Sequence, residues 1–274
     1  MDNSILKETE EILVRLFTER EYLNQVSSTG GLPQYQNYSF DRRGASIYAA
    51  VLQTNRLATM KSIYPRTARV LADHFEGSIT NYGLILHELV KSSPAGANTF
   101  LLNHLGSYFP EYFQARESRL ASEYPYLQTL IQFEAATAEL VDMAENTEAE
   151  KEKTVSASPR QDLLKVNPCH KIFRFQYDIA EIIEAVDTCK NPSSLSFQPK
   201  NVVTLMLRNP RSYKIRLLEI NSLTALLIEH AAGRKTSLED LTAIAQDHCL
   251  LPAESLNKHL MALVEELRNE FVFI

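Results

Sequence analysis

Cysteine is scarce in this 274-residue sequence, which has only Cys169, Cys189 and Cys249. So small and odd a number is typical of a reducing compartment and excludes a disulfide-stapled secreted fold. No apolar run approaches the length of a membrane span, and the N-terminus lacks the basic start and apolar core of a signal peptide. We therefore expect a cytoplasmic protein with no membrane partner.

Sequence signatures of catalysis are also missing. The eight glycines are scattered, so no glycine-rich loop precedes a helix to hold a phosphate, and there is no Gly-x-Ser-x-Gly. Cys-x-x-Cys and His-Glu-x-x-His are absent as well, and neither of the adjacent pairs Cys169-His170 and His248-Cys249 makes a natural metal chelate. The sequence predicts a chain without catalytic residues, metal or cofactor of its own.

An excess of positive charge is not found either. Lys and Arg total 28 against 34 Asp and Glu, giving a formal charge of −6. Proteins that bind nucleic acid usually have the opposite balance, so nucleic-acid binding by the whole chain is disfavoured. The apolar and charged fractions, 45% and 23%, are those of an ordinary globular protein and exclude wholesale disorder.

The chain divides at a polar stretch from Glu145 to Gln161, rich in Glu, Lys, Ser and Thr. Such a segment buries too little apolar surface to offset its ordering entropy, which predicts a linker. We expect a helical domain over residues 1–150, a linker over 151–165 and a second domain over 166–274.

Apolar residues recur at helical spacing throughout the first domain. The pattern predicts a helix from about Ser46 to Ile63 that stops before Tyr64-Pro65, and a new helix that starts at Pro65. Ser78 is expected to cap the next helix, and a long helix follows Tyr124-Pro125.

In the second domain, apolar residues recur at every second position. Alternation predicts strands over His170–Ile179, around Val203–Leu207, and around Tyr213–Leu217, with a turn at 209–212. Three helices follow, the second starting with a capping box at Ser237. The fold class is therefore α+β, an all-helical domain followed by a small winged-helix-like domain. That layout is used either to place a helix in a DNA groove or to add a peptide strand to the open sheet edge.

No acid occurs between Asp187 and Glu219, although the gap contains six cations. They are Lys190, Lys200, Arg208, Arg211, Lys214 and Arg216. Alternation is expected to put Lys214 and Arg216 on the outer face of the third strand. A cationic edge strand either prevents sheet-to-sheet aggregation or docks an acidic extended peptide or a phosphate backbone.

Two charged residues fall on apolar helix faces in the first domain, Arg56 and Glu134. Because an unpaired buried charge is costly, we predict that they form a structural ion pair with no catalytic role.

The chain resembles the partner subunits of multinuclear iron oxidases in peptide natural-product pathways, the methanobactin-, bufferin- and 3-thiaglutamate-type systems. Relatives of the helical domain were once labelled DNA-binding proteins. The similarity is spread over both domains, and Ala49 and Ala135 depart from residues common in the family. The matching stretches are Ile47-Tyr48, Tyr64-Pro65, Val70-Leu71, Phe75, Phe100 to Phe109-Pro110, Tyr124 to Leu127, Phe133-Glu134, Val202 to Ile220, His230 to Gly233 and Ser237 to Glu239.

The resemblance implies a non-catalytic accessory subunit. In such systems the iron belongs to a separate TIM-barrel oxidase, and the accessory chain holds the leader of a ribosomally made precursor peptide. Leader peptides in such systems tend to be acidic, so the cations between Asp187 and Glu219 are expected to attract the leader. We expect the peptide to add as a strand beside the third strand, with the third helix as the other wall. The predicted contact residues are Arg208, Arg211, Ser212, Tyr213, Lys214, Ile215, Arg216, Leu217, Leu218, Leu256, His259 and Leu260.

Two alternatives remain open. A winged-helix DNA-binding regulator would use the same hairpin and helix, although the third helix is rich in acids and a groove-entering helix should be basic. The other alternative is an enzyme whose site no motif reveals.

Overall fold

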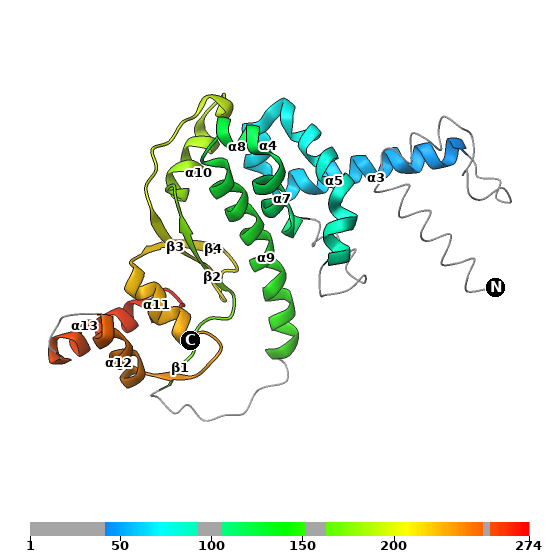
Figure 1. Ribbon diagram of the computed structural model, residues 1–274. Helices are drawn as coiled ribbons and strands as arrows, with labels where there is room; N and C mark the ends of the chain where they lie inside the picture. Colours follow the sequence, from blue (N-terminus) through cyan, green and yellow to red (C-terminus); the bar gives the residue numbers. More distant parts are fainter. Residues whose placement is uncertain (1–41, 93–105, 152–162, 249–252, 274) are drawn as a thin grey trace, which may run out of the picture. The chain divides into compact units, whose positions relative to one another are not determined.

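The computed structural model describes residues 42–92, 106–151, 163–248 and 253–273 (Figure 1). It contains both helices and a three-stranded antiparallel sheet, so the protein is α+β. Within these ranges no helix combines the length and apolar character needed to cross a bilayer. Residues 152–162 of the predicted linker and Cys249 lie outside the described residues, whereas Lys151 ends α9 and Leu163–Leu164 forms the strand β1, so the ends of the predicted linker are regular structure.

The chain forms two compact units, one comprising Met1–Ile131 with Val186–Leu195, the other Gln132–Ala185 with Ser196–Ile274. This division differs from the expected one, because it falls inside a helix and returns a later segment to the first unit. The returned segment is held there by side chains of the first unit: Arg66 pairs with Asp187, and Arg69 donates to the carbonyl of Cys189. Composition along the sequence can indicate a linker, but it cannot show that a later segment packs with the first unit.

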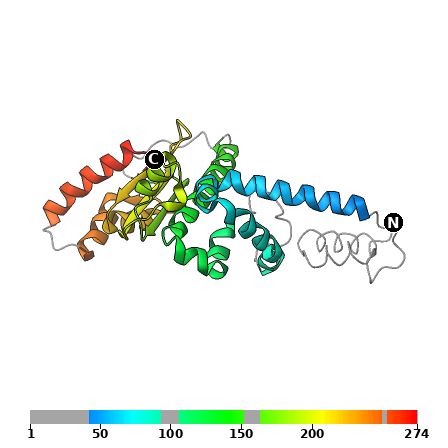
Figure 2. The same cartoon turned by 90° about the horizontal axis from the view of Figure 1, so that it is seen from above.

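The first unit is helical. Its elements are α3 (Arg42–Ile63), α4 (Pro65–Leu71), η1 (Ala72–His74), α5 (Phe75–Ser92), α7 (Phe109–Arg116), α8 (Ser118–Glu123), the start of α9 (Leu127–Lys151) and η2 (Pro192–Ser194). Figure 2 shows α3 as a long straight helix. It ends where Tyr64-Pro65 predicts, and Pro65 occupies the first turn of α4.

An aromatic cluster forms the core of this unit. Phe109 is fully buried, with ring centroids 5.0 Å from Tyr64 and 5.4 Å from Tyr82. The expected cap at Ser78 is wrong: α5 begins at Phe75, and the buried Ser78 hydroxyl donates to the carboxylate of Glu117 at 2.9 Å. A serine inside a helix serves here as a tertiary hydrogen-bond donor rather than as a cap.

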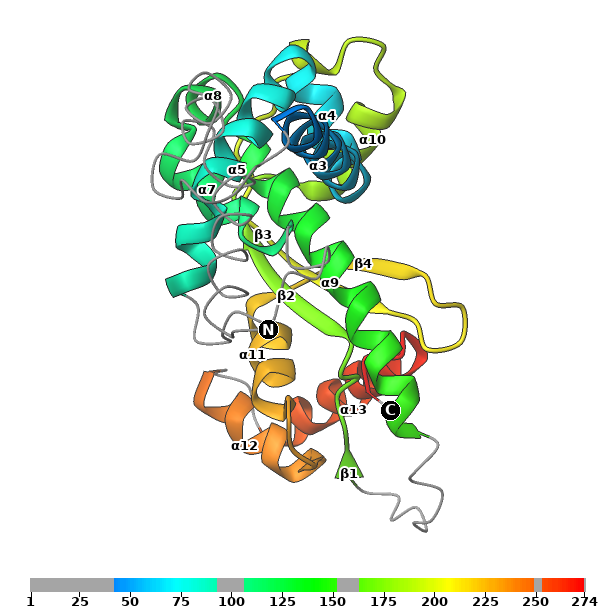
Figure 3. The ribbon, with the colours of Figure 1, turned by 90° about the vertical axis from the view of Figure 1, so that its right-hand side faces the viewer.

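The second unit contains the sheet, whose strand order is β2 (His170–Phe175), β3 (Val202–Arg208), β4 (Ile215–Ile220). Figure 3 shows the three strands with α9 running along them. The remaining elements are β1 (Leu163–Leu164), α10 (Ile179–Thr188), α11 (Ser222–Ala231), β5 (Thr236–Ser237), α12 (Leu238–His248) and α13 (Ala253–Asn269). The predicted strand, hairpin and three helices are therefore present, and the short β1–β5 pair is an addition.

The helices α11, α12 and α13 cover one sheet face. Leu205 and Leu207 of β3 pack with Ile228, Leu241 and Leu260 in one buried cluster. The capping box before α12 is confirmed, because Ser237 and Asp240 bond each other reciprocally at 2.8–3.1 Å. The opposite sheet face meets α9 through a salt bridge from Lys171 to Glu139.

Candidate functional site

The outer edge of β4 has no strand beside it in the described part of the chain. The amide of Asn209 donates to the carbonyl of Lys214 at 2.9 Å, so this pair is a hydrogen-bonded pair of the β3–β4 ladder. Because such pairs alternate along an antiparallel ladder, every second residue of β4 directs its N–H and C=O outward. Those residues are Ile215, Leu217 and Glu219.

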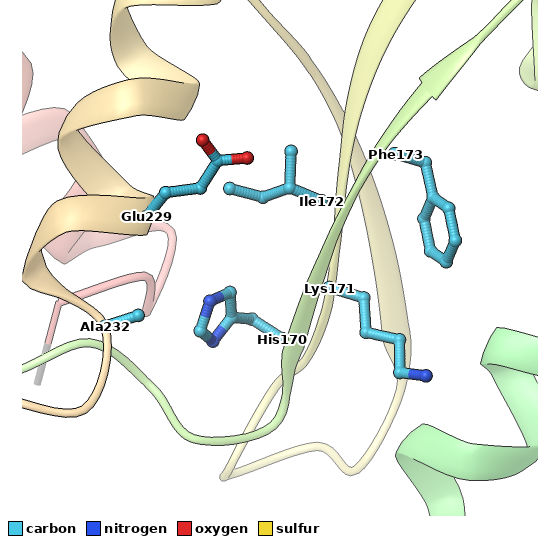
Figure 4. Close-up of a pocket in the computed structure, with 6 residues that line it drawn as sticks. All are labelled: His170, Lys171, Ile172, Phe173, Glu229 and Ala232. Atoms are coloured by element: carbon cyan, nitrogen blue, oxygen red, sulfur yellow. The ribbon is translucent and has the colours of Figure 1, made fainter.

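The edge of β2 is open as well. Arg208 donates its amide to the carbonyl of Cys169 at 3.0 Å, and the same alternation leaves His170, Ile172 and Arg174 facing outward. A shallow pocket of about 420 Å³ lies beside this edge. In Figure 4, His170 and Ile172 point toward Glu229 of α11 and Ala232 just after it, whereas Lys171 and Phe173 point away. The sequence analysis did not identify this pocket.

Charges at the β2 edge are already paired. Arg174 makes two bonds to the Glu229 carboxylate, at 2.8 and 3.1 Å, and Lys171 bridges to Glu139. Burial lowers the pKa of His170, whose Nδ1 lies 2.6 Å from the carbonyl oxygen of Asn167. This edge therefore offers backbone groups but little uncompensated charge.

The turn between β3 and β4 has a defined geometry. The Asn209 side chain accepts from the amides of Arg211 and Ser212 at 2.8 and 2.9 Å, which confirms the turn predicted there. Tyr213 follows with φ 58°, in the left-handed region that favours glycine, and its side chain is 53% exposed. A bulky aromatic residue is thus held outward at the end of the hairpin.

Three cations at this turn lack a carboxylate partner among the described residues. Arg208 donates to the carbonyls of Val141 and Tyr213 at 2.8 and 3.2 Å and lies over the Tyr213 ring, 5.2 Å from its centroid. Arg211 lies over the ring of Phe271, 5.1 Å from its centroid. Lys214 is exposed. Within the described ranges, the partners of Arg208 and Arg211 are therefore carbonyl oxygens and aromatic rings rather than carboxylates.

Arg216 is exposed, with 45% of its side chain accessible, but it lies on the other strand face from the one expected. It shares its sheet face with Leu218 and Ile220, which pack against the helices, and it forms an ion pair with Glu270 at the end of α13. The sequence of β4 allows either set of alternate residues to face the helices, because the two leucines Leu217 and Leu218 are adjacent. Leu217 and Leu218 are both half-buried, and the structure places Leu218 on the side of the helices.

The third helix also differs from the expectation. Leu256 and Leu260 are each 2% exposed and belong to the core, so they cannot contact a docked peptide. His259 is exposed, with Nδ1 2.7 Å from the Ser255 carbonyl, and Met261, which the analysis missed, is 57% exposed. The spacing of Leu256, Leu260 and Val264 is that of a core stripe, and it could have shown this assignment in advance.

The predicted ion pair joins residues of different units, Arg56 in the first and Glu134 in the second, and stays a prediction. Glu134 is buried, at 2% exposure. Arg56 packs against Gly83, where a Cβ atom would collide with the guanidinium. Burial lowers the pKa of Arg56, and nearby Tyr82 opposes that shift.

The described ranges contain no cluster of three His, Cys, Asp or Glu side chains that could hold a metal ion. Cys169 is buried and Cys189 half-buried, and neither forms a disulfide bond with another residue that the structure describes. The comparisons with known proteins add nothing to this picture: no family model matches the sequence, and no curated protein matches it.

Proposed function

We propose that this chain is a non-catalytic accessory subunit. It binds a ribosomally made precursor peptide by strand addition to β4 and presents the peptide's cysteine-containing end to a separate multinuclear iron oxidase. The helical unit packs on that oxidase, and the iron belongs to the partner. The observation that carries the proposal is the open β4 edge, with the outward backbone groups of Ile215, Leu217 and Glu219 next to a cationic turn.

The order of elements supports this function. A three-stranded antiparallel sheet followed by three helices resembles a winged-helix recognition domain, and an open sheet edge binds an extended peptide through main-chain hydrogen bonds. The resemblance to accessory subunits of iron oxidases supports the identity of the peptide and of the partner.

Charge favours β4 over β2 as the docking edge. The cations Lys171 and Arg174 on β2 are each paired with a carboxylate, whereas Arg208, Arg211 and Lys214 beside β4 are not, among the residues that the structure describes. An acidic peptide therefore gains more electrostatic binding energy along β4 than along β2, because the cations beside β4 are not already paired with the described carboxylates.

Matched proline variants on the two edges test the docking position. Leu217→Pro removes an outward N–H from β4, and Ile172→Pro removes one from β2, without loss of a ladder bond in either case. Displayed random 14-residue peptides would be selected on the full-length protein, and affinities of the enriched peptides measured by fluorescence anisotropy. We expect Leu217→Pro to weaken binding by about tenfold and Ile172→Pro to leave it nearly unchanged.

Failure of any peptide to enrich, or loss of binding only in Ile172→Pro, would contradict docking at β4. Thermal unfolding of both variants controls for misfolding. Lys214→Glu is a second test of the docking position that leaves the backbone of β4 unchanged, and it too should weaken the binding of acidic peptides. Arg216→Glu is a poor choice, because it would place two acids together at Glu270.

The accessory role is tested by affinity purification of the tagged chain from its native host, with mass spectrometry and iron analysis of the eluate. We expect an iron-containing enzyme in stoichiometric amount that modifies its precursor peptide only when this chain is present. Turnover of the peptide by this chain alone would instead establish an enzyme. A metal-free monomer that binds duplex DNA with steep salt dependence would establish a regulator.

A further inference from the structure

The end of the β3–β4 hairpin carries an exposed surface that strand addition alone does not use. This surface, here called the hairpin-tip patch, consists of Val141, Arg208, Arg211, Tyr213 and Lys214. Arg208 joins its parts, because its guanidinium donates to the carbonyl of Val141 and lies over the ring of Tyr213. Val141 and Tyr213 are 39% and 53% exposed.

We propose that the hairpin-tip patch fixes the register of the bound peptide by holding an acidic side chain next to an apolar one. The inference rests on the proposed strand addition and specifies which part of the peptide lies where. Its partner is an extended peptide with a short acidic and apolar block at one end.

Charge complementarity identifies the acidic component. The patch carries three cations, of which Arg208 and Arg211 contact carbonyls and rings and Lys214 is exposed, so a carboxylate that binds there replaces no existing acid among the described residues. The far end of β4 is different: Glu219 is an exposed acid, 3.8 Å from Lys200, and Lys200 also bonds Asp178 at 2.8 Å. The edge is therefore cationic at the turn and carries an acid at the other end, which aligns a peptide of uneven charge.

The conformation of Tyr213 identifies the apolar component. A non-glycine residue in the left-handed region is strained, so the fold would gain stability from glycine at this position. Tyrosine instead places a half-exposed ring against the guanidinium of Arg208, which also bonds the carbonyl of exposed Val141. Rings in such positions supply contact area for apolar side chains at low entropic cost.

Synthetic peptides test the assignment. The probes are fluorescent 14-residue peptides of alternating Thr and Val that carry Glu-Leu-Glu at the N-terminal end, at the C-terminal end or in the middle, and a matched set with Lys-Leu-Lys. We expect one of the two end placements of the acidic block to bind about five- to tenfold more tightly than the other acidic peptides, and more tightly than every Lys peptide.

Two variants remove the patch without endangering the fold. Tyr213→Gly suits the left-handed backbone, and Lys214→Gln removes an exposed charge. Each should abolish most of the preference for the acidic end block, whereas Lys165→Gln, an exposed lysine elsewhere in the same unit, should preserve it. Equal affinity for all acidic placements, or an unchanged preference in both patch variants, would overturn the inference.

Outcomes for the register and for strand addition are separable. If the peptides bind and Leu217→Pro weakens them while acid placement has no effect, strand addition stands and the register inference fails. If no peptide binds, both fail. If a 20-base-pair DNA duplex binds at physiological salt and Lys214→Gln weakens it, both also fail, and the patch is a phosphate-binding surface.

Discussion

The guanidinium of Arg66 donates two hydrogen bonds, of 2.9 and 2.7 Å, to the carboxylate of Asp187, although the two residues are 121 positions apart. Arg69 adds a second cation, 3.7 Å from the same carboxylate. Asp187 lies in the last turn of α10, and Tyr126 donates to the carbonyl of Pro192 a few residues later. These contacts fasten residues 186–195 to the helical unit, so the chain between β2 and β3 serves both units.

Removing this carboxylate should loosen the segment. We expect Asp187→Ala to cost about 1 kcal/mol, because the pair is bidentate but partly exposed, and to speed amide hydrogen exchange over residues 186–195. Asp73→Ala, an exposed acid in the same unit, serves as the control and should change neither. Equal exchange in the two variants would show that the ion pair does not hold the segment.

Local signals predicted much of the fold. The proline in the first turn of α4, the capping box at the start of α12 and the turn at Asn209 each depend on neighbouring residues, and each is confirmed. The cap at Ser78 was wrong because its partner, Glu117, is remote in sequence. The same limit hid the return of residues 186–195 to the helical unit.

Alternation along a strand did not decide which way the side chains of the candidate site face. Leu205 and Leu207 of β3 are buried as predicted, but Met206 between them is buried as well, because both faces of the sheet are covered. In β4 the neighbours Leu217 and Leu218 allow two phases, and only packing against the helices decides which side Arg216 occupies. The open pocket beside β2 depends on α11, so no pattern within β2 reveals it.

Phe109 should be the most sensitive single position of the helical unit. Its ring contacts Tyr64 and Tyr82 and lies 5.9 Å, in stacked orientation, from Tyr112. Phe109→Ala should cost about 3–5 kcal/mol through lost burial and a residual cavity, and Phe109→Leu clearly less, as measured by urea unfolding. A cost below about 1 kcal/mol for the alanine variant would contradict the central position of this ring.

His170 should make stability depend on pH. Burial lowers its pKa in the folded protein, although the bond at Asn167 opposes that shift. As the pH falls below about 6.5, the unfolded chain takes up a proton that the folded chain binds less readily, so the free energy of unfolding decreases until the folded pKa is reached. His170→Gln removes this contribution. Denaturant midpoints between about pH 7.5 and 5.5 should therefore fall more steeply for the wild type, and parallel curves would refute the assignment.

Asn167 joins the start of the sheet unit to its C-terminal end. Its amide nitrogen donates to the carbonyls of Arg208 and Phe271, both at 3.1 Å, and its oxygen accepts from the amide of Cys169 at 2.9 Å. Asn167→Asp replaces the donor with an oxygen facing two carbonyls in a buried position, which should cost about 2–4 kcal/mol.

The exposed Asn201→Asp is the matched control and should leave the unfolding free energy within about 0.5 kcal/mol of the wild type. Because the Asn167 bonds also position Phe271, over which Arg211 lies, the Asn167→Asp substitution should alter the hairpin-tip patch as well. Peptide affinity should therefore fall together with stability. A variant that unfolds more easily yet binds the end-acid peptide as tightly as the wild type would show that Asn167 supports the core without positioning the patch.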